Sequence, residues 1–272
     1  MSRSDPILRV RNLTARIGTR KESIQALRGI SFDIDAGEAV GFVGESGCGK
    51  SVTARAIMRL APEGTSVELG GSVHFTGTDL LHLSETEMCD LRGRRIAMVF
   101  QDPMTSLNPV MTIGSQIDDI VRRHLGLSRI AARRRTVELL RQVGIPDPER
   151  RSDSYPHQFS GGMRQRVLIA IAISCNPDLL IADEPTTALD VTVQAEILRL
   201  LMQLRDERGM SLMLITHDFG VVAGVVERVN VMYRGEIVET GSVERVFAEP
   251  EHDYTRALLN AVPRLNSPGR VQ

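Results

Sequence analysis

The sequence is poor in cysteine and has no long apolar run. Cys48, Cys89 and Cys175 are scattered without a C-x-x-C pair, which excludes a disulfide framework and a zinc or iron–sulfur site. The longest apolar stretch, Val167–Ile173, is far shorter than the ~20 residues of a membrane-spanning helix. The charged N-terminus, Met1–Val10, lacks the apolar core of a signal peptide. We therefore expect a soluble chain that stays in the cytoplasm.

An excess of either charge is also absent. The 272 residues carry 33 basic and 34 acidic side chains, which gives a net charge of −1. Because a general nucleic-acid-binding protein has a basic excess, we expect no nucleic-acid partner. The basic residues are nearly all arginine, and the only lysines are Lys21 and Lys50. A lysine retained in such a chain suits a site too tight for a guanidinium group.

Four short apolar runs each end in a polar residue or a glycine. The runs are Ala39–Val43, Ile96–Phe100, Leu179–Ala182 and Leu212–Ile215. Runs of this length are typical of parallel strands that are covered on both faces. Since open α/β sheets bind ligands beyond the carboxyl ends of their strands, the residues that follow should meet at one rim. Those residues are Gly44, Gln101, Asp183 with Glu184, and His217.

Outside these runs the sequence predicts two other kinds of structure. Phe32–Ile34 alternates with polar residues, and Val67–Phe75 contains Gly70-Gly71, which we interpret as a hairpin signal. These segments predict an N-terminal antiparallel β subdomain. Residues 105–175 are mainly helical in pattern, and Val231–Val238 is typical of a hairpin. The fold class is therefore α/β, with a mainly parallel sheet.

Gly44–Ser51 matches the phosphate-binding pattern G-x-x-x-x-G-K-[ST] between a strand and a helix. The glycines let successive backbone N–H groups converge on phosphate oxygens, and the helix N-terminus adds its positive dipole end. Lys50 would neutralise the β- and γ-phosphates, and Ser51 would hold magnesium. The loop residues that we predict to bind nucleotide are Gly44, Glu45, Ser46, Gly47, Cys48, Gly49, Lys50, Ser51 and Val52.

Asp183 and Glu184 end a fully apolar run, where a carboxylate pair is costly unless it manages a cation or a proton. We assign Asp183 to the magnesium shell and Glu184 to the base that polarises the attacking water. His217 follows the next run and is placed to contact the γ-phosphate. Taken alone, His217 and Gln101 each fit a structural role better than a functional one.

Ser160–Gln165 precedes the apolar helix Val167–Ile173. Ser160 is suited to cap that helix, and the glycines expose its N-terminal amides. The simpler interpretation is a capped helix only. The alternative is a second phosphate-facing helix end, which has no partner in its own phosphate-binding loop and would face a nucleotide on another subunit.

The ordered motifs resemble those of ATP-binding subunits of ABC transporters, from about residue 7 to residue 263. In chain order they are the Walker A motif Gly44–Ser51, the Q-loop Gln101, the signature Ser160–Gln165, the Walker B motif Leu179–Glu184, the D-loop Ala188–Asp190 and the switch His217. The resemblance implies a P-loop NTPase core in a single ABC ATPase domain over residues 1–263. It further implies an inserted helical signature subdomain at about 105–175 and a short tail at 264–272.

Two segments resemble the oligopeptide, dipeptide and nickel importer branch of that family: Gln101–Pro109 and Glu249–Leu259. Two positions depart from its pattern. Ile17 stands where such subunits often place an aromatic ring against adenine, so base stacking is weaker there. Asp253 replaces a proline that is common between the histidine and the tyrosine of the tail.

The resemblance implies a head-to-tail dimer with ATP and Mg²⁺ sandwiched between the subunits. One subunit would supply the catalytic residues Glu184, His217 and Gln101 and the metal ligands Ser51, Gln101 and Asp183. The opposing subunit would supply Ser160, Gly161, Gly162 and Gln165, with Asp190 near the seam.

The implied partners are a second ATP-binding subunit, identical or different, two permeases and an extracytoplasmic solute-binding protein. The location is peripheral, at the cytoplasmic face of the inner membrane. The leading function is to power peptide import; import of nickel, an opine or another small solute is the alternative. A non-transport ABC ATPase of DNA repair or translation fits less well. Residues 101–160 leave room only for a compact helical subdomain, and the chain has one phosphate-binding loop.

Overall fold

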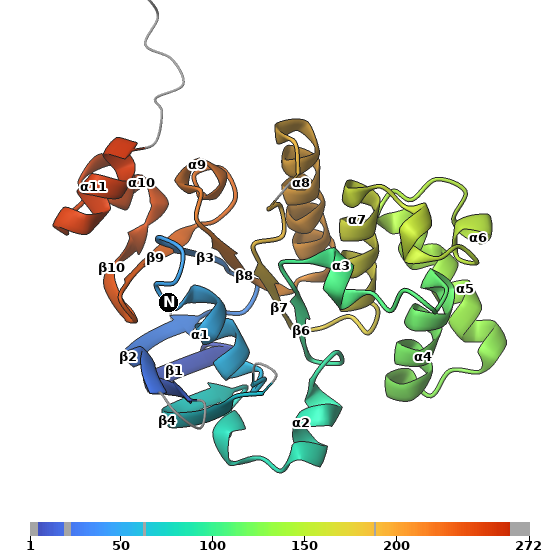
Figure 1. Ribbon diagram of the computed structural model, residues 1–272, viewed down its shortest axis with the longest axis horizontal. Helices are drawn as coiled ribbons and strands as arrows, with labels where there is room; N and C mark the ends of the chain where they lie inside the picture. Colours follow the sequence, from blue (N-terminus) through green and yellow to red (C-terminus); the bar gives the residue numbers. More distant parts are fainter. Residues whose placement is uncertain (1–4, 19–22, 62–63, 188, 262–272) are drawn as a thin grey trace, which may run out of the picture.

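The computed structural model describes residues 5–18, 23–61, 64–187 and 189–261. An α/β core and a helical subdomain lie side by side in it (Figure 1). The tail predicted at 264–272, and Ala188 of the D-loop, lie outside the described residues.

A six-stranded sheet forms the centre, in the order β10-β9-β3-β8-β7-β6. The four apolar runs are all strands of this sheet, and they run parallel as predicted. The hairpin predicted near the end of the chain is also present, with an antiparallel pair, β9 and β10. The bounds are β3 Ala39–Val43, β6 Ile96–Val99, β7 Leu179–Asp183, β8 Ser211–Thr216, β9 Arg228–Tyr233 and β10 Glu236–Ser242.

Both faces of this sheet are covered, which explains the unbroken apolar runs. Val40 and Phe42 of β3 pack with helix α1 and the N-terminal sheet, whereas Ala39 and Val43 pack with the helices on the other face. The helices that flank the sheet or follow its strands are α1 Lys50–Ile57, α7 Gly161–Ala172, α8 Val191–Arg208, α9 Phe219–Val222, α10 Val243–Ala248 and α11 Asp253–Ala261.

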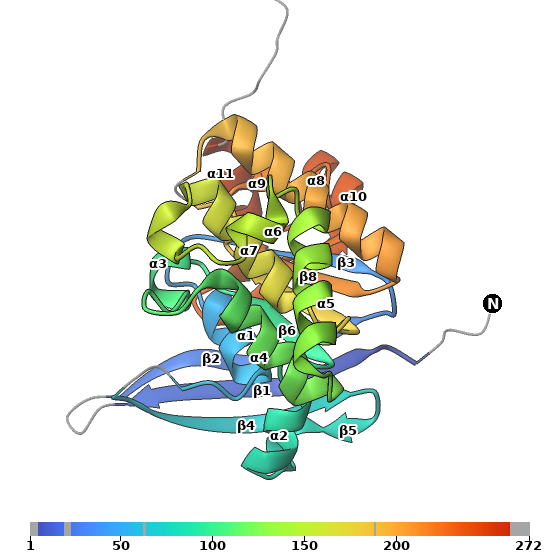
Figure 2. The ribbon, with the colours of Figure 1, turned by 90° about the vertical axis from the view of Figure 1, so that its right-hand side faces the viewer.

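The N-terminal sheet is antiparallel, in the order β2-β1-β4-β5, and lies beneath α1 in Figure 2. Its bounds are β1 Leu8–Gly18, β2 Ser23–Ile34, β4 Ser66–Phe75 and β5 Thr78–Asp79. The predicted hairpin turn at Gly70-Gly71 is wrong, because both residues lie inside β4, beside an irregularity in β1. A side chain at Gly71, where φ is +87°, would come within 2.3 Å of the Asn12 carbonyl oxygen. Close backbone approach, rather than a turn, explains the glycine.

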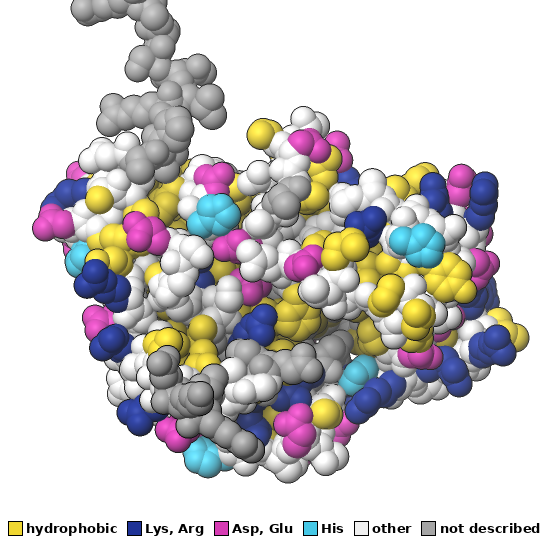
Figure 3. All heavy atoms as spheres, viewed as in Figure 1, with side chains coloured by type: hydrophobic (Ala, Val, Ile, Leu, Met, Phe, Trp, Pro, Cys, Tyr) yellow, Lys and Arg dark blue, Asp and Glu magenta, His cyan; other side chains and the backbone are white. Residues whose placement is uncertain are grey.

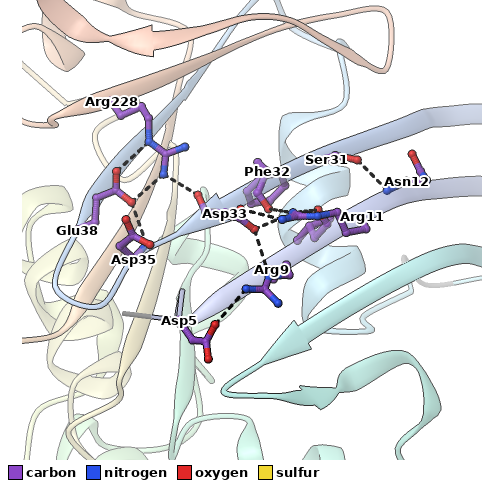
Figure 4. A network of polar contacts seen from close by, with 11 residues as sticks. Asp5, Arg9, Arg11, Asn12, Ser31, Phe32, Asp33, Asp35, Glu38 and Arg228 are labelled. Carbon is purple, nitrogen blue, oxygen red and sulfur yellow. Dashed lines mark hydrogen bonds and ion pairs between the residues drawn. The ribbon is translucent and has the colours of Figure 1, made fainter. Parts of the chain in front are cut away.

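An arginine network joins the two sheets (Figure 4). Arg228 of β9 donates to both carboxylate oxygens of Glu38, at 2.8 Å each, and to the Asp33 carbonyl oxygen at 2.7 Å. Arg11 of β1 donates to both carboxylate oxygens of Asp33, at 2.7 and 2.8 Å. The bonds of Arg228 join β9 of the central sheet to the end of β2 and to the turn that precedes β3, whereas the bidentate Arg11–Asp33 pair joins β1 to β2 within the N-terminal sheet.

The helical subdomain follows β6 and returns to the core through α7. Its helices are α3 Pro103–Ser106, α4 Ile113–Leu125, α5 Arg129–Gln142 and α6 Pro148–Arg151, while α2 Glu85–Leu91 precedes β6. Single 3₁₀ turns lie at Leu80–His82 and Pro156–Gln158. None of the helices in the described ranges combines the length and the hydropathy of a membrane span.

Candidate nucleotide-binding site

The loop between β3 and α1 has a backbone that only glycine accommodates. Gly44, Gly47 and Gly49 all have positive φ, and a side chain at Gly44 would come within 2.2 Å of the Met232 carbonyl oxygen. Lys50 is 4% exposed, and its Nζ donates to the Gly44 carbonyl oxygen at 2.7 Å and to that of Glu45 at 2.9 Å. The loop therefore wraps around a buried ammonium group.

Two of the predicted metal ligands touch each other. The Ser51 hydroxyl donates to Asp183 Oδ1 at 2.8 Å, and Asp183 is 2% exposed. Burial raises the pKa of Asp183; the Ser51 hydrogen bond opposes this shift, and the neighbouring Glu184 charge adds to it. A buried carboxylate beside a hydroxyl suits Mg²⁺, which takes few protein ligands and completes its shell with water and phosphate oxygens. In the described part of the chain, His, Cys, Asp and Glu form no cluster of three that would hold a metal by itself.

Glu184 has a strained backbone conformation, and three polar side chains contact its carboxylate. Its φ is +47°, a conformation that non-glycine residues adopt rarely and mainly at functional sites. Its carboxylate accepts hydrogen bonds from Gln101 Nε2 and Thr187 Oγ1, both at 2.8 Å, and Oε1 lies 3.4 Å from His217 Nδ1. The structure thus brings Gln101, Glu184 and His217 together, as the rim argument predicts.

These groups line one pocket of about 540 Å³. The sequence-predicted residues on its wall are Gly44, Glu45, Ser46, Gly47, Gly49, Lys50, Ser51, Val52, Gln101, Glu184 and His217. Sequence reasoning missed Ala26 and Leu258, which also line it, and Thr187, which holds Glu184. The position of Thr187 between the Walker B and D-loop motifs could have indicated it. Leu258 belongs to the segment Glu249–Leu259 that resembles the importer branch, but that resemblance does not indicate a contact with the pocket, and no sequence pattern marks Ala26.

Two predicted nucleotide contacts lie off this wall. Ile17 is in β1, paired with Ile24 of β2 and Val67 of β4, so its contact with adenine stays a prediction. The Cys48 side chain is 5% exposed, and its sulfur lies 3.6 Å from Lys50 Nζ. Cys48 therefore does not line the pocket, and its contact with nucleotide stays a prediction.

The signature residues form a separate site near the start of α8. Ser160 caps α7 by accepting a hydrogen bond from the Met163 N–H at 3.3 Å, and Asp190 caps α8 through the Val193 N–H at 3.0 Å. A side chain at Gly162 would come within 2.8 Å of Val193, so the two helix starts are in contact. Gln165 is 2% exposed, and its Nε2 has no partner within the described ranges. This site is not part of the pocket wall.

Comparison with known proteins gives consistent matches. The chain matches the ABC transporter family over residues 27–187, and the oligopeptide/dipeptide transporter C-terminal region over residues 238–272. It is 56% identical over 261 residues to the probable peptide ABC transporter ATP-binding protein y4tR of Sinorhizobium fredii, covering 96% of this chain and 78% of that protein. It is 53% identical to the oligopeptide transport ATP-binding protein OppD of Bacillus subtilis, covering 100% of this chain and 76% of that protein.

Solved structures agree. The ATP-binding cassette MJ0796, in a dimeric post-hydrolysis state bound to ADP and Pi, is 29% identical, with a TM-score of 0.76 over 87% of this chain and 98% of that one. The cbiO1 protein of Clostridium perfringens, part of the cbiONQ ABC transporter complex, is 28% identical, with a TM-score of 0.74 over 90% of this chain and 92% of that one. The predicted fold class is confirmed.

Proposed function

The chain belongs to the ABC transporter family as an ATP-binding subunit and is an ATPase, and we propose that it powers the import of peptides through a membrane permease. One observation carries the ATPase assignment at the level of residues. Lys50 and Ser51 share a single pocket with Gln101, Glu184 and His217. The peptide assignment rests on the names of the relatives and on the match of the C-terminal segment.

The loop amides and Lys50 would bind the ATP phosphates. Lys50 would leave the two carbonyl oxygens that it now contacts and neutralise the β- and γ-phosphates. Ser51, Asp183 and Gln101 would hold Mg²⁺, which would stabilise charge on the phosphate oxygens. The contact between Ser51 and Asp183 supports this assignment, because it already joins two of the three ligands.

Glu184 would orient the attacking water and accept its proton. Its carboxylate is 11% exposed, and Gln101, Thr187 and His217 restrict its movement. His217 is 57% exposed and has the freedom to turn from Glu184 toward the γ-phosphate. The chemistry is therefore positioning and general-base catalysis, with no covalent intermediate on the protein.

A second ATP-binding subunit would complete the site. The signature residues Ser160 and Gly162 lie off the pocket wall, at an exposed start of α7 that points backbone amides outward. A head-to-tail dimer would bring this helix end of one subunit to the phosphates held by the other. ATP would then close the dimer, since its phosphates are fully bound only in the closed state.

The segment after Gln101 would contact the permease. Met104 and Val110 are 62% and 80% exposed, which is unusual for large apolar side chains. Apolar side chains also gather over the helical subdomain on the face seen in Figure 3. We propose two permeases, a second ATP-binding subunit and an extracytoplasmic solute-binding protein as partners. The chain would lie at the cytoplasmic face of the inner membrane.

A tagged pull-down from detergent-solubilised membranes, followed by mass spectrometry, tests the proposal. We expect two permeases, a second ATPase and a solute-binding protein whose ligand is a peptide. Val110→Glu should lose the permeases, whereas Ile130→Glu, at an equally exposed position (76%) on α5, should keep them. Recovery of only ribosomal or DNA-repair proteins would retain the ATPase and refute transport. A binding protein specific for nickel would refute the peptide cargo.

A further inference from the structure

The C-terminal helix α11 reaches back to the nucleotide-binding loop. The Tyr254 hydroxyl oxygen accepts a hydrogen bond from the Glu45 backbone N–H at 2.9 Å. Leu258, one helical turn further on, lines the pocket itself. In Figure 1, α11 lies near β9 and β10, the strands that lead to it. One wall of the pocket is thus formed by a segment 209 residues away from Glu45 in sequence.

Tyr254 is held in place on several sides. Its ring packs against Tyr233 of β9, with 4.2 Å between the ring centroids, and its N–H donates to His252 Nδ1 at 3.1 Å. The Glu239 carboxylate accepts the backbone N–H groups of Glu251 and His252 at 2.9 and 3.1 Å. Burial alone would raise the pKa of Glu239, but these hydrogen bonds, together with the Thr255 side chain and the charge of Arg245, outweigh it and the pKa is lowered. The start of α11 is therefore anchored on a charged, buried carboxylate of β10.

Nucleotide binding changes what holds Glu45. In this structure its N–H is bound by Tyr254 and its carbonyl oxygen by Lys50. When Lys50 turns to the phosphates, the carbonyl oxygen loses that partner. The hydrogen bond to Tyr254 does not depend on Lys50, so it is available to keep the first turn of the loop in position.

We propose that Tyr254 is a positioning residue for the phosphate-binding loop, and that α11 tunes nucleotide affinity through it. This proposal rests on the proposed function of the pocket. It assigns to the C-terminal segment a task in nucleotide binding, in addition to any contact with partner proteins. A positioned loop binds ATP and ADP better by the same factor, because both nucleotides occupy it through the phosphates that they share.

Tyr254→Phe tests the proposal, since it keeps the ring and removes only the hydroxyl. We expect the KM for ATP and the Kd values for ATP and ADP to rise about threefold to tenfold, the effect of losing one hydrogen bond. The kcat should stay near its wild-type value, and the melting temperature should fall by no more than about 2–4 °C, the shift that about 1 kcal/mol gives. The matched control is Tyr233→Phe, which alters the other ring of the pair and leaves the Glu45 N–H bound to Tyr254.

Three results for nucleotide affinity would overturn the proposal. They are unchanged KM and Kd in Tyr254→Phe, an equal effect in Tyr233→Phe, or an effect on ATP alone, which would mean direct contact with the γ-phosphate. A fall in kcat at constant KM would overturn it as well. The wild-type chain separates this proposal from the function itself. If the wild-type chain fails to hydrolyse ATP, the proposed function is wrong. If the wild-type chain hydrolyses ATP and Tyr254→Phe has the same KM and Kd values, only the role of Tyr254 is wrong.

Discussion

Two helices in this molecule, α1 and α7, begin at glycine-rich segments. The two segments differ in how many nearby residues are arranged to bind phosphates. The start of α1 has three glycines with positive φ and a buried lysine around one pocket, and the buried carboxylate of Asp183 accepts a hydrogen bond from Ser51 of the pocket wall. The start of α7 has an ordinary serine cap, and positive φ is absent from Gly161 and Gly162. The first is shaped to hold phosphates by itself. The second is a capped helix end, and in the proposed function its ligand would be held by another subunit.

Removing the base should break the first site most strongly. Glu184→Gln should keep ATP binding and lower turnover by about 10²–10⁴-fold, the usual contribution of a general base. The measurement is kcat from phosphate release, together with the Kd for ATP. Thr187→Val, which removes one hydrogen bond to Glu184, is the milder control. Near-normal turnover in Glu184→Gln would remove Glu184 from this role.

Placing a charge at the start of α7 should lower turnover without changing the Kd of the single chain for ATP. Aspartate caps helices as well as serine does, so Ser160→Asp should fold, but its charge would repel a γ-phosphate from another subunit. We expect turnover to fall about tenfold to a hundredfold, comparable to the loss of one transition-state contact. Ser160→Thr keeps the hydroxyl and is the control. If the Kd for ATP rises in the isolated chain, Ser160 contacts the nucleotide bound by its own subunit. The distinction between the two helix starts would then be wrong.

Mixing the two inactive variants sharpens this test. If the chain dimerises with itself head to tail, half of the random dimers contain one intact site. Equal amounts of Glu184→Gln and Ser160→Asp should then recover about a quarter of wild-type turnover. No recovery in dimers shown to be mixed would mean that both sets of residues act within one subunit.

The first helix start was predictable from sequence because its function dictates local residues. Only glycine tolerates the loop backbone at Gly44, and only short apolar strands deliver Gln101, Glu184 and His217 to one rim. Tyr254 and Leu258 were not predictable as site residues, since their contacts depend on how α11 folds back over the core. The prediction of a turn at Gly70-Gly71 was wrong for the same reason, because the glycine at position 71 is required by the close approach of a neighbouring strand.

One substitution in each site should change the stability of the folded chain with opposite sign. Because the folded chain raises the pKa of Asp183, mainly by burial, its ionised form costs stability. Asp183→Asn should raise the melting temperature of the nucleotide-free chain by about 2–4 °C, the shift that about 1 kcal/mol gives. Ser160→Ala loses a cap worth about 1 kcal/mol and should lower it by a similar amount.

The pH dependence checks the cause of the Asp183 effect. Below the unfolded pKa of about 4, both states are protonated and the variant has no advantage. As the pH rises, the unfolded carboxyl ionises first and the folded one resists, so the advantage of Asp183→Asn should grow until the folded pKa is passed. It should then stay constant. An advantage already complete at pH 3 would exclude burial of the charge as its origin.

The smallest effect is expected for the substitution Cys48→Ser. It tests whether the first site depends on the side chain at this position or only on the backbone. Its sulfur lies off the pocket wall and its carbonyl oxygen accepts the Gly235 N–H, so Cys48→Ser should change kcat and KM by no more than about twofold. An alkyl group on the same atom has little room, because Cys48 is 5% exposed and its sulfur lies 3.6 Å from Lys50 Nζ. Alkylation of the wild-type chain should therefore stop turnover, with protection by ATP and Mg²⁺, while Cys48→Ser resists the reagent. Normal hydrolysis by a chain alkylated at Cys48 would show that the loop yields around this side chain, and that its backbone is less constrained than its glycines suggest.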